Sequence, residues 1–138
     1  MHRTVRPWDS SAEKSEIVPT ILLADDEAAI RHYLSTRLQP VNARILEAAD
    51  GEAALALARA EHPDVVVLDL GMPKRNGLEV CRQLKVDPAT QASHVFILTG
   101  YPVDEVEPAA GAAGADGVFA EPRETGVLCQ RNADLLSD

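Results

Sequence analysis

Acidic residues stand directly after two apolar segments of this sequence. Asp25 and Asp26 follow residues 21–24, and Asp69 follows residues 65–68. In an open parallel α/β sheet, the carboxyl ends of the strands border one crevice, and ligands bind there. Three carboxylates at that edge would form a site for a hard cation and for chemistry on an anionic group.

Two more apolar segments end in polar residues, and the same argument places these residues at the same edge. Thr99 follows residues 94–98, and Glu121 follows residues 117–120. The threonine adds a hydroxyl group that can donate a hydrogen bond to an anion. Glu121 is unexpected, because a positive charge would be expected beside a site for an anionic group.

The composition is that of one acidic globular domain. The chain has 138 residues, of which 46% are hydrophobic, and its formal net charge is −9. This charge repels nucleic acids and anionic membranes, so direct DNA binding is not expected. No apolar segment approaches the ~20 residues of a transmembrane helix, and no signal-peptide pattern is present. We therefore expect a cytoplasmic domain in which Cys81 and Cys129 are free thiols.

Strand-like and helix-like segments alternate from about residue 19 onwards. Residues 1–18 are polar and lack periodicity, which indicates a flexible N-terminal extension, and residues 19–138 are expected to form the folded domain. The expected strands are 20–24, 43–48, 64–68, 94–98 and 117–120, and the expected helices are about 27–38, 51–62, 78–85, 103–113 and 124–136. Strict alternation with short connections predicts a doubly wound, five-stranded parallel α/β sheet with helices on both faces.

Five short motifs occur in a fixed order along this pattern. They are ILLADDE at 21–27, ADGEAAL at 49–55, VLDLGMP at 67–73 with Gly77, ILTG at 97–100, and GADG at 114–117 before Pro122. In this order and at these separations, they resemble the receiver domain of bacterial two-component response regulators. The resemblance covers about residues 20–137 and implies the flavodoxin-like receiver fold.

The resemblance implies a magnesium site at the acidic edge. Asp26 and Asp69 would ligate Mg²⁺ with the main-chain carbonyl of Gly71, and Asp25 would ligate it directly or through water. Three crowded carboxylates repel one another, so without the metal the pKa of one of them should be raised. Pro73 and Gly77 are expected to have structural roles, Gly77 because glycine permits unusual backbone angles.

The resemblance also implies what the site does. Asp69 would be the phosphoacceptor, attacking a phosphoryl group carried on a histidine of a sensor histidine kinase or histidine phosphotransferase. The Thr99 hydroxyl and a main-chain N–H such as that of Gly100 would bind phosphoryl oxygens. The domain would be a signalling phosphoprotein rather than an enzyme, and its aspartyl phosphate would regulate a downstream effector protein. Homodimerisation is left open, and we expect a stand-alone receiver because no output domain follows in this sequence.

Three positions depart from the family pattern. Glu121 stands where the family has a lysine that pairs with the phosphoacceptor and with a phosphoryl oxygen. Val118 stands where a tyrosine or phenylalanine is usual, and Phe119 should lie on the opposite sheet face. Pro108 lies inside the segment before the last strand, and glycines at 111 and 114 flank its end, so a short or irregular helix is expected there.

These departures leave alternatives open. The chain could be an atypical pseudo-receiver, a phosphate-independent protein-interaction module, because of Glu121 and Val118. Lys74, Arg75 or Arg123 could replace the missing cation, or Glu121 could be an additional metal ligand. An aspartate-dependent phosphatase is disfavoured, because such enzymes place an acid two residues after the nucleophile and this chain has a glycine there.

Overall fold

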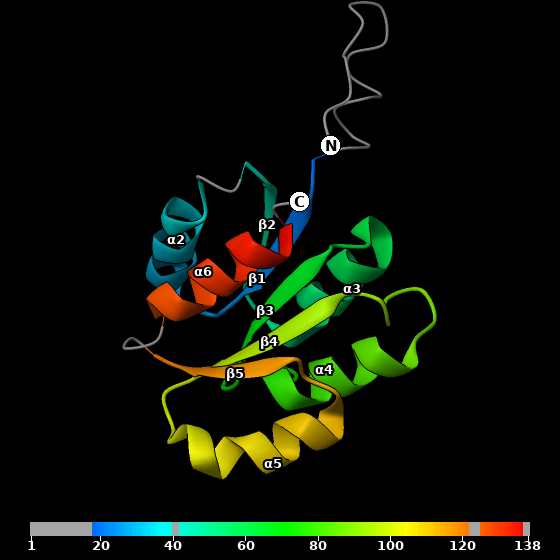
Figure 1. Cartoon of the computed structure of the whole chain (residues 1–138). Coiled ribbons are helices and arrows are strands. Elements are labelled where there is room, and N and C mark those ends of the chain that lie inside the picture. The colour runs from blue at the N-terminus through cyan, green and yellow to red at the C-terminus, as the bar shows by residue number, and fades with distance from the viewer. Residues whose placement is uncertain (1–17, 40–41, 122–124, 137–138) are drawn as a thin grey trace, which may run out of the picture.

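The computed structural model describes residues 18–39, 42–121 and 125–136. The predicted N-terminal extension therefore lies almost wholly outside the described residues. Within them, five parallel strands form one sheet in the order β2-β1-β3-β4-β5 (Figure 1). The strands are β1 Thr20–Ala24, β2 Arg44–Ala48, β3 Val65–Asp69, β4 His94–Thr99 and β5 Gly117–Ala120. The predicted doubly wound parallel sheet is confirmed.

Helices cover both faces of this sheet. Figure 1 shows α2 and α6 on one face and α3, α4 and α5 on the other. Their bounds are α2 Ala28–Arg37, α3 Gly51–Glu61, α4 Gly77–Val86, α5 Val103–Ala113 and α6 Thr125–Leu136. Each strand is followed by a helix that crosses one face, so every strand points its carboxyl end toward the same edge of the sheet.

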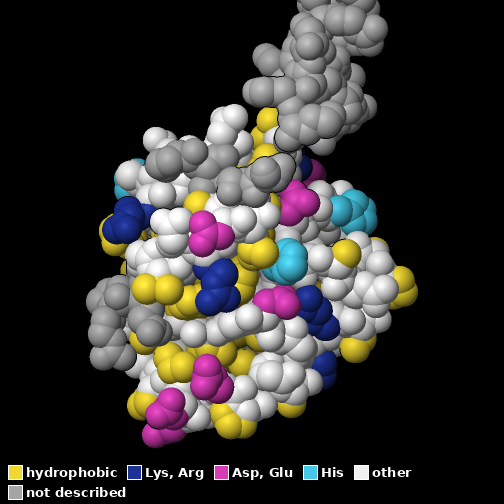
Figure 2. Space-filling model, in the orientation of Figure 1, with side chains coloured by type: hydrophobic (Ala, Val, Ile, Leu, Met, Phe, Trp, Pro, Cys, Tyr) yellow, Lys and Arg dark blue, Asp and Glu magenta, His cyan; other side chains and the backbone are white. Residues whose placement is uncertain are grey.

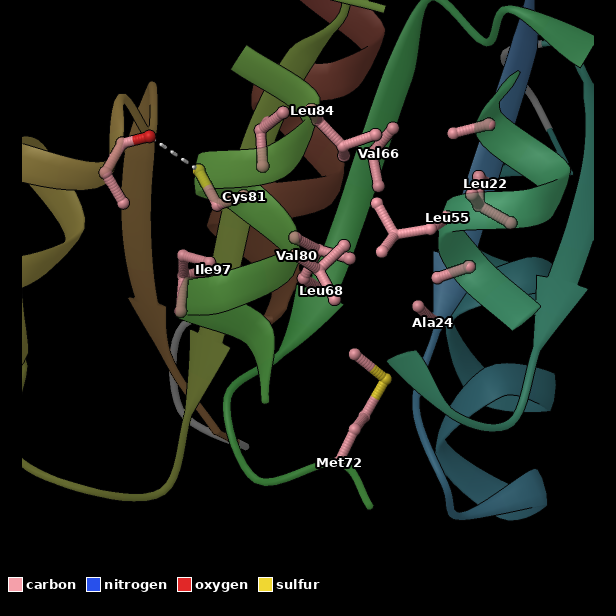
Figure 3. Close-up of a cluster of buried hydrophobic side chains, with 14 of the residues drawn as sticks. Leu22, Ala24, Leu55, Val66, Leu68, Met72, Val80, Cys81, Leu84 and Ile97 are labelled. Carbon is pink, nitrogen blue, oxygen red and sulfur yellow. Dashed lines mark hydrogen bonds between the residues drawn. The ribbon is translucent and has the colours of Figure 1, made fainter. Parts of the chain in front are cut away.

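Alternate residues of the central strands build two separate cores. Leu22, Val66 and Ile97 belong to the core beneath α3, α4 and α5, part of which Figure 3 shows. Their neighbours Ile21 and Val67 belong to the core beneath α2 and α6. Because side chains alternate between the faces of a strand, a strand that is buried on both faces must be apolar throughout. The apolar segments of this sequence meet that requirement, and this burial holds the strand ends in place.

Side-chain caps set the start of two helices near the acidic edge. The Asp50 carboxylate accepts a hydrogen bond of 2.8 Å from the N–H of Ala53 at the start of α3. Asn76 likewise accepts one of 2.9 Å from the N–H of Glu79 at the start of α4. These caps satisfy amide groups that have no partner within the helix.

The expectation of a short or irregular helix before the last strand is wrong. The helix α5 runs for 11 residues with Pro108 inside it. Val106, Ala110 and Ala113 are buried against the sheet, and this burial outweighs the roughly 3 kcal/mol that an interior proline costs. Gly114 does not interrupt the helix but ends it, in a left-handed conformation with φ of 94° that glycine adopts readily.

The two cysteines are free, as the sequence predicts, and the surface carries charges of both signs (Figure 2). Figure 2 shows basic and acidic side chains interspersed over one face of the domain. Cys81 and Cys129 are buried and form no disulfide. Among the described residues, no helix is long and apolar enough to cross a membrane.

Gly77 has a structural role, but for a different reason from the predicted one. Its backbone angle is not in the positive-φ region. A Cβ atom at this position would instead lie 2.6 Å from the main-chain oxygen of Asp69. The start of α4 therefore packs against the end of β3 so closely that only glycine fits.

We predict that Gly77→Ala lowers the free energy of unfolding by about 1–3 kcal/mol, because the added methyl group must push main-chain atoms apart. Urea denaturation would measure this change. Gly111→Ala is the matched control, because a Cβ there meets nothing within 4 Å. The control should be neutral or stabilising by up to ~1 kcal/mol. Equal stabilities for the Gly77→Ala variant and the native chain would contradict the packing argument.

Candidate functional site

Three aspartates meet at the carboxyl edge of the sheet, as the sequence predicts. Asp25 and Asp26 follow β1, and Asp69 is the last residue of β3, the strand that pairs with β1. Each contributes a carboxylate oxygen to a group whose members lie within 4.8 Å of one another. Asp25 is buried, Asp69 is half-buried and Asp26 is exposed, so the group opens to solvent on one side.

The main chain of Asp25 is held on both sides. Its N–H donates a hydrogen bond of 3.0 Å to the carbonyl of Ala48 on β2. Its own carbonyl accepts one of 2.6 Å from Arg31, whose guanidinium also pairs with Glu47 at 2.8 Å. Sequence reasoning missed this role of Arg31. The signal in the sequence that could have indicated this contact is the position of Arg31, directly after Ile30 on a helix that must pack on the sheet.

The two carboxylate oxygens of Asp25 have different surroundings. Oδ1 accepts a hydrogen bond of 2.9 Å from the N–H of Glu27. Oδ2 is buried, since only 2% of Asp25 is exposed, and it has no hydrogen-bond partner among the described residues. Buried polar atoms in proteins are nearly always paired. An oxygen that lacks a donor and belongs to a group of carboxylates fits a site for a hard cation.

The loop after β3 presents Asp69. The N–H of Leu70 donates to the carbonyl of Leu98, and the N–H of Gly77 donates to the carbonyl of Leu70. The N–H of Gly71 lies 3.3 Å from Oδ1 of Asp69 and donates to it. Gly71 is therefore beside the phosphoacceptor candidate, and its carbonyl remains a predicted metal ligand.

Burial and crowding raise the pKa values of the acids. Burial is the main reason that the pKa of Asp25 rises from 3.8 to about 7, and the charges of Asp69, Glu121 and Asp26 raise it further. The hydrogen bond from Glu27 opposes this rise. Burial also raises the pKa of Asp69, and Asp26 adds to the effect. Sequence reasoning expected repulsion to raise a pKa here, but desolvation is the larger cause.

Thr99 lies one strand across from Asp69. It is the last residue of β4 and fully buried, and Asp69 pairs in register with the residue before it, Leu98. Its hydroxyl oxygen accepts a hydrogen bond of 2.9 Å from the N–H of Tyr101, so the hydroxyl hydrogen can point elsewhere. Gly100 is exposed and follows directly, which leaves its surroundings open to a ligand.

Glu121 turns inward at the same edge. Its N–H donates to the carbonyl of Thr99 at 2.8 Å, and its buried Oε2 has no hydrogen-bond partner in the part of the chain that the structure describes. Burial raises its pKa, and the charges of Asp69, Glu27 and Asp26 raise it further. Among the described residues, the compact oxygen group consists of the three aspartates, so the Glu121 carboxylate stands just outside it.

The described cations that could replace the family lysine point elsewhere. Lys74 lies 3.8 Å from Asp50, and Arg75 pairs with Glu79 at 3.1 Å. Arg123 lies outside the described residues. In the part of the chain that the structure describes, no lysine or arginine forms an ion pair with Glu121 or with the three aspartates.

The structure supports the expected placement of Val118 and Phe119. Val118 is half-buried and packs against the core beneath α3, α4 and α5. Phe119 belongs to the opposite core, where its ring contacts that of Phe96 edge-on at a centroid distance of 5.8 Å. The phenylalanine therefore cannot take the place of the aromatic residue that Val118 replaces.

A doubly wound sheet with three aspartates, a strand-end threonine and a following glycine at one edge defines the class of receiver-like α/β domains. Residues 21–132 match the family described as the response regulator receiver domain. The chain belongs to this family, whose members are signalling modules of two-component systems.

Individual relatives agree with this assignment. The chain is 52% identical over 65 residues to a probable transcriptional regulator, ycf27, of Porphyridium aerugineum, a match that covers 47% of this chain and 27% of that protein. It is 35% identical over 120 residues to the transcriptional regulatory protein AfsQ1 of Streptomyces coelicolor, covering 86% of this chain and 52% of that protein. These matches span about a quarter to a half of the relatives' lengths.

A solved structure shows the same fold. The signal receiver domain of a DNA-binding response regulator protein from Colwellia psychrerythraea superposes with a TM-score of 0.80 at 29% identity. The match covers 87% of this chain and 99% of that one.

We predict that the metal-free domain loses stability as the pH rises from about 4 to about 7. The pKa of Asp25 is higher in the folded state than its ordinary value, so the folded state binds more protons in this range and is favoured at its lower end. Urea denaturation in EDTA would measure the slope. Asp25→Asn should flatten it and stabilise the domain by on the order of 2 kcal/mol at about pH 8.

The exposed acid Glu107 provides the control for this prediction. Glu107→Gln removes one negative charge from α5 and should leave the slope unchanged. If Asp25→Asn and Glu107→Gln gave the same slope as the native chain, Asp25 would not be the group responsible.

Proposed function

We propose that this chain accepts a phosphoryl group on Asp69 in a two-component phosphorelay, with Mg²⁺ held by Asp25, Asp26 and Asp69. The observation that carries the proposal is the compact group of three carboxylates, in which a buried oxygen of Asp25 has no hydrogen-bond partner among the residues that the structure describes. Mg²⁺ prefers such oxygen ligands and usually keeps several waters, which suits a site that is open on one side. The Gly71 carbonyl would complete the protein's share of the ligands.

The chemistry assigned to the chain's own residues is a simple displacement. An Asp69 carboxylate oxygen attacks the phosphorus atom of a phosphohistidine, and the phosphorus–nitrogen bond breaks. The electron pair stays on the imidazole nitrogen, which takes a proton from solvent, and the product is an aspartyl phosphate. A bound Mg²⁺ would neutralise part of the charge on the phosphoryl oxygens. The Thr99 hydroxyl and the Gly100 N–H would donate hydrogen bonds to those oxygens.

The partners follow from this role. A sensor histidine kinase or histidine phosphotransferase would supply the phosphoryl group, and a downstream effector protein would read the modified domain. The net charge of −9 argues against direct contact of this domain with nucleic acid.

A second candidate function is that of a pseudo-receiver that binds partners without phosphorylation. Glu121 favours it, because this half-buried residue, with its Oε2 buried, stands where the family has a lysine that would meet a phosphoryl oxygen. Two unit charges ~4 Å apart interact by about 4 kcal/mol at an effective dielectric constant of 20. With Glu121 in place of the lysine, attraction of the phosphoryl oxygens becomes repulsion, which opposes phosphoryl transfer. Val118 also stands where the family usually has the aromatic residue that takes part in switching.

We predict that acetyl phosphate with Mg²⁺ adds the mass of one phosphoryl group to the native chain, slowly because of Glu121. Intact-mass spectrometry over time would follow the reaction. Asp69→Asn should abolish the mass gain, because it removes the attacking carboxylate. A native chain that gains no mass dependent on Asp69 would remove the phosphoacceptor proposal.

We predict that Glu121→Lys speeds this reaction by on the order of tenfold or more, since it replaces repulsion of the phosphoryl oxygens by attraction. The same mass measurement applies. Glu107→Lys is the control, because it makes the same change of charge at an exposed position on α5. If the Glu121→Lys variant is phosphorylated and the native chain is not, the pseudo-receiver function is favoured for the native chain. Equal rates for Glu121→Lys and the native chain would show that Glu121 does not affect transfer.

A further inference from the structure

The helix α6 packs on the sheet through a narrow buried face. Leu128 and Cys129 precede Asn132 by four and three residues, so all three side chains point to the same side of the helix. Their exposed fractions are 0%, 7% and 0% in the order Leu128, Cys129 and Asn132. Leu128 and Cys129 belong to the core beneath α2 and α6, against which Leu136 also packs. Asn132 therefore places a polar amide on the side of α6 that faces an apolar core.

The Asn132 side chain is buried without the hydrogen bonds that an amide requires. Neither its Oδ1 nor its Nδ2 has a hydrogen-bond partner among the described residues. Burying an amide without such partners is unfavourable, because its hydrogen bonds to water are lost and nothing replaces them. Nearly all buried polar atoms in proteins are paired. The packed position of α6 therefore carries a penalty that an apolar residue at position 132 would not cause.

The helix α4 provides a comparison within the same molecule. Val80, Cys81 and Leu84 have the same spacing on α4 as the three buried residues of α6, and each is at most 1% exposed. Figure 3 shows them in the core on the other face of the sheet. A leucine thus stands on α4 where α6 has Asn132. The two side chains have the same number of heavy atoms and the same branching, so they differ in polarity far more than in shape.

We propose that α6 is a detachable helix, which the unpartnered Asn132 amide predisposes to open locally while the sheet and the other helices stay folded. Opening lets water reach both polar atoms of the amide, so the penalty is absent from the open state. Opening also uncovers Cys129 and thereby controls the access of thiol reagents to it. The inference depends neither on the metal site nor on phosphorylation of Asp69.

Labelling of the folded native chain with N-ethylmaleimide measures this opening, with Cys81 as the internal control. Cys81 is 0% exposed on α4, and its thiol donates a hydrogen bond of 3.5 Å to the carbonyl of Ala113. We expect Cys129 to react at least about tenfold faster than Cys81, because local opening is more frequent than global unfolding. Peptide mass spectrometry would assign each label. If both cysteines react at one common rate, global unfolding exposes them together and the proposal is overturned.

Two variants test whether the amide is the cause. Asn132→Leu gives α6 the residue that α4 has at the corresponding place, and it should slow the labelling of Cys129 by about tenfold or more. Asn132→Asp places an unpaired carboxylate at the same buried position and should speed the labelling by about tenfold or more. Circular dichroism would confirm that each variant is folded. If Asn132→Leu leaves the rate at Cys129 unchanged, the thiol reacts without the proposed opening and the proposal is overturned.

Gln130→Leu is the matched control on the same helix. Gln130 is exposed and donates a hydrogen bond of 3.0 Å to Asp134, so this substitution makes a similar change of polarity without altering the buried face. It should change the labelling rate of Cys129 by no more than about twofold. If Gln130→Leu slows the labelling as much as Asn132→Leu does, the effect belongs to the helix in general, and the role of the buried amide is overturned.

Discussion

Mutual repulsion among carboxylates at one edge of the sheet is the constraint on which the rest of this site depends. Asp25, Asp26 and Asp69 come within 4.8 Å of one another because two paired parallel strands end there. Strands packed between two apolar cores cannot move apart to relieve the repulsion. The charge must be met by protonation or by a cation. The buried Asp25 oxygen, which no described residue meets with a hydrogen bond, is the local sign of that need.

The surrounding residues hold the main chain rather than neutralise the acids. Arg31 donates to the carbonyl of Asp25, and its charge is paired with Glu47. Gly77 permits α4 to pack against the main chain of Asp69. These contacts fix where the carboxylates stand, and none of the described lysines or arginines forms an ion pair with them. A site of this kind is prepared for a positively charged ligand, and the inward-turned Glu121 strengthens that property.

Much of this arrangement could be predicted from the sequence, because it follows from periodicity. Apolar runs that end in Asp25 and Asp69 indicate buried parallel strands, and parallel strands bring their carboxyl ends together. The regular helix around Pro108 could not be predicted in this way, because local propensity does not include the burial of Val106 and Ala110. The inward direction of Glu121 could not be predicted either, since a residue after a strand can turn either way.

The central claim is that Asp69, with Mg²⁺ at the neighbouring acids, receives a phosphoryl group. Fluorine NMR of the native chain with Mg²⁺ and beryllofluoride, which mimics a phosphoryl group on a carboxylate, tests it most directly. If Asp69 receives the phosphoryl group beside Mg²⁺, bound fluorine resonances appear, and they vanish in Asp69→Asn and on removal of Mg²⁺ by EDTA. If the folded domain with Mg²⁺ gave only the resonances of free beryllofluoride, this result would contradict the claim.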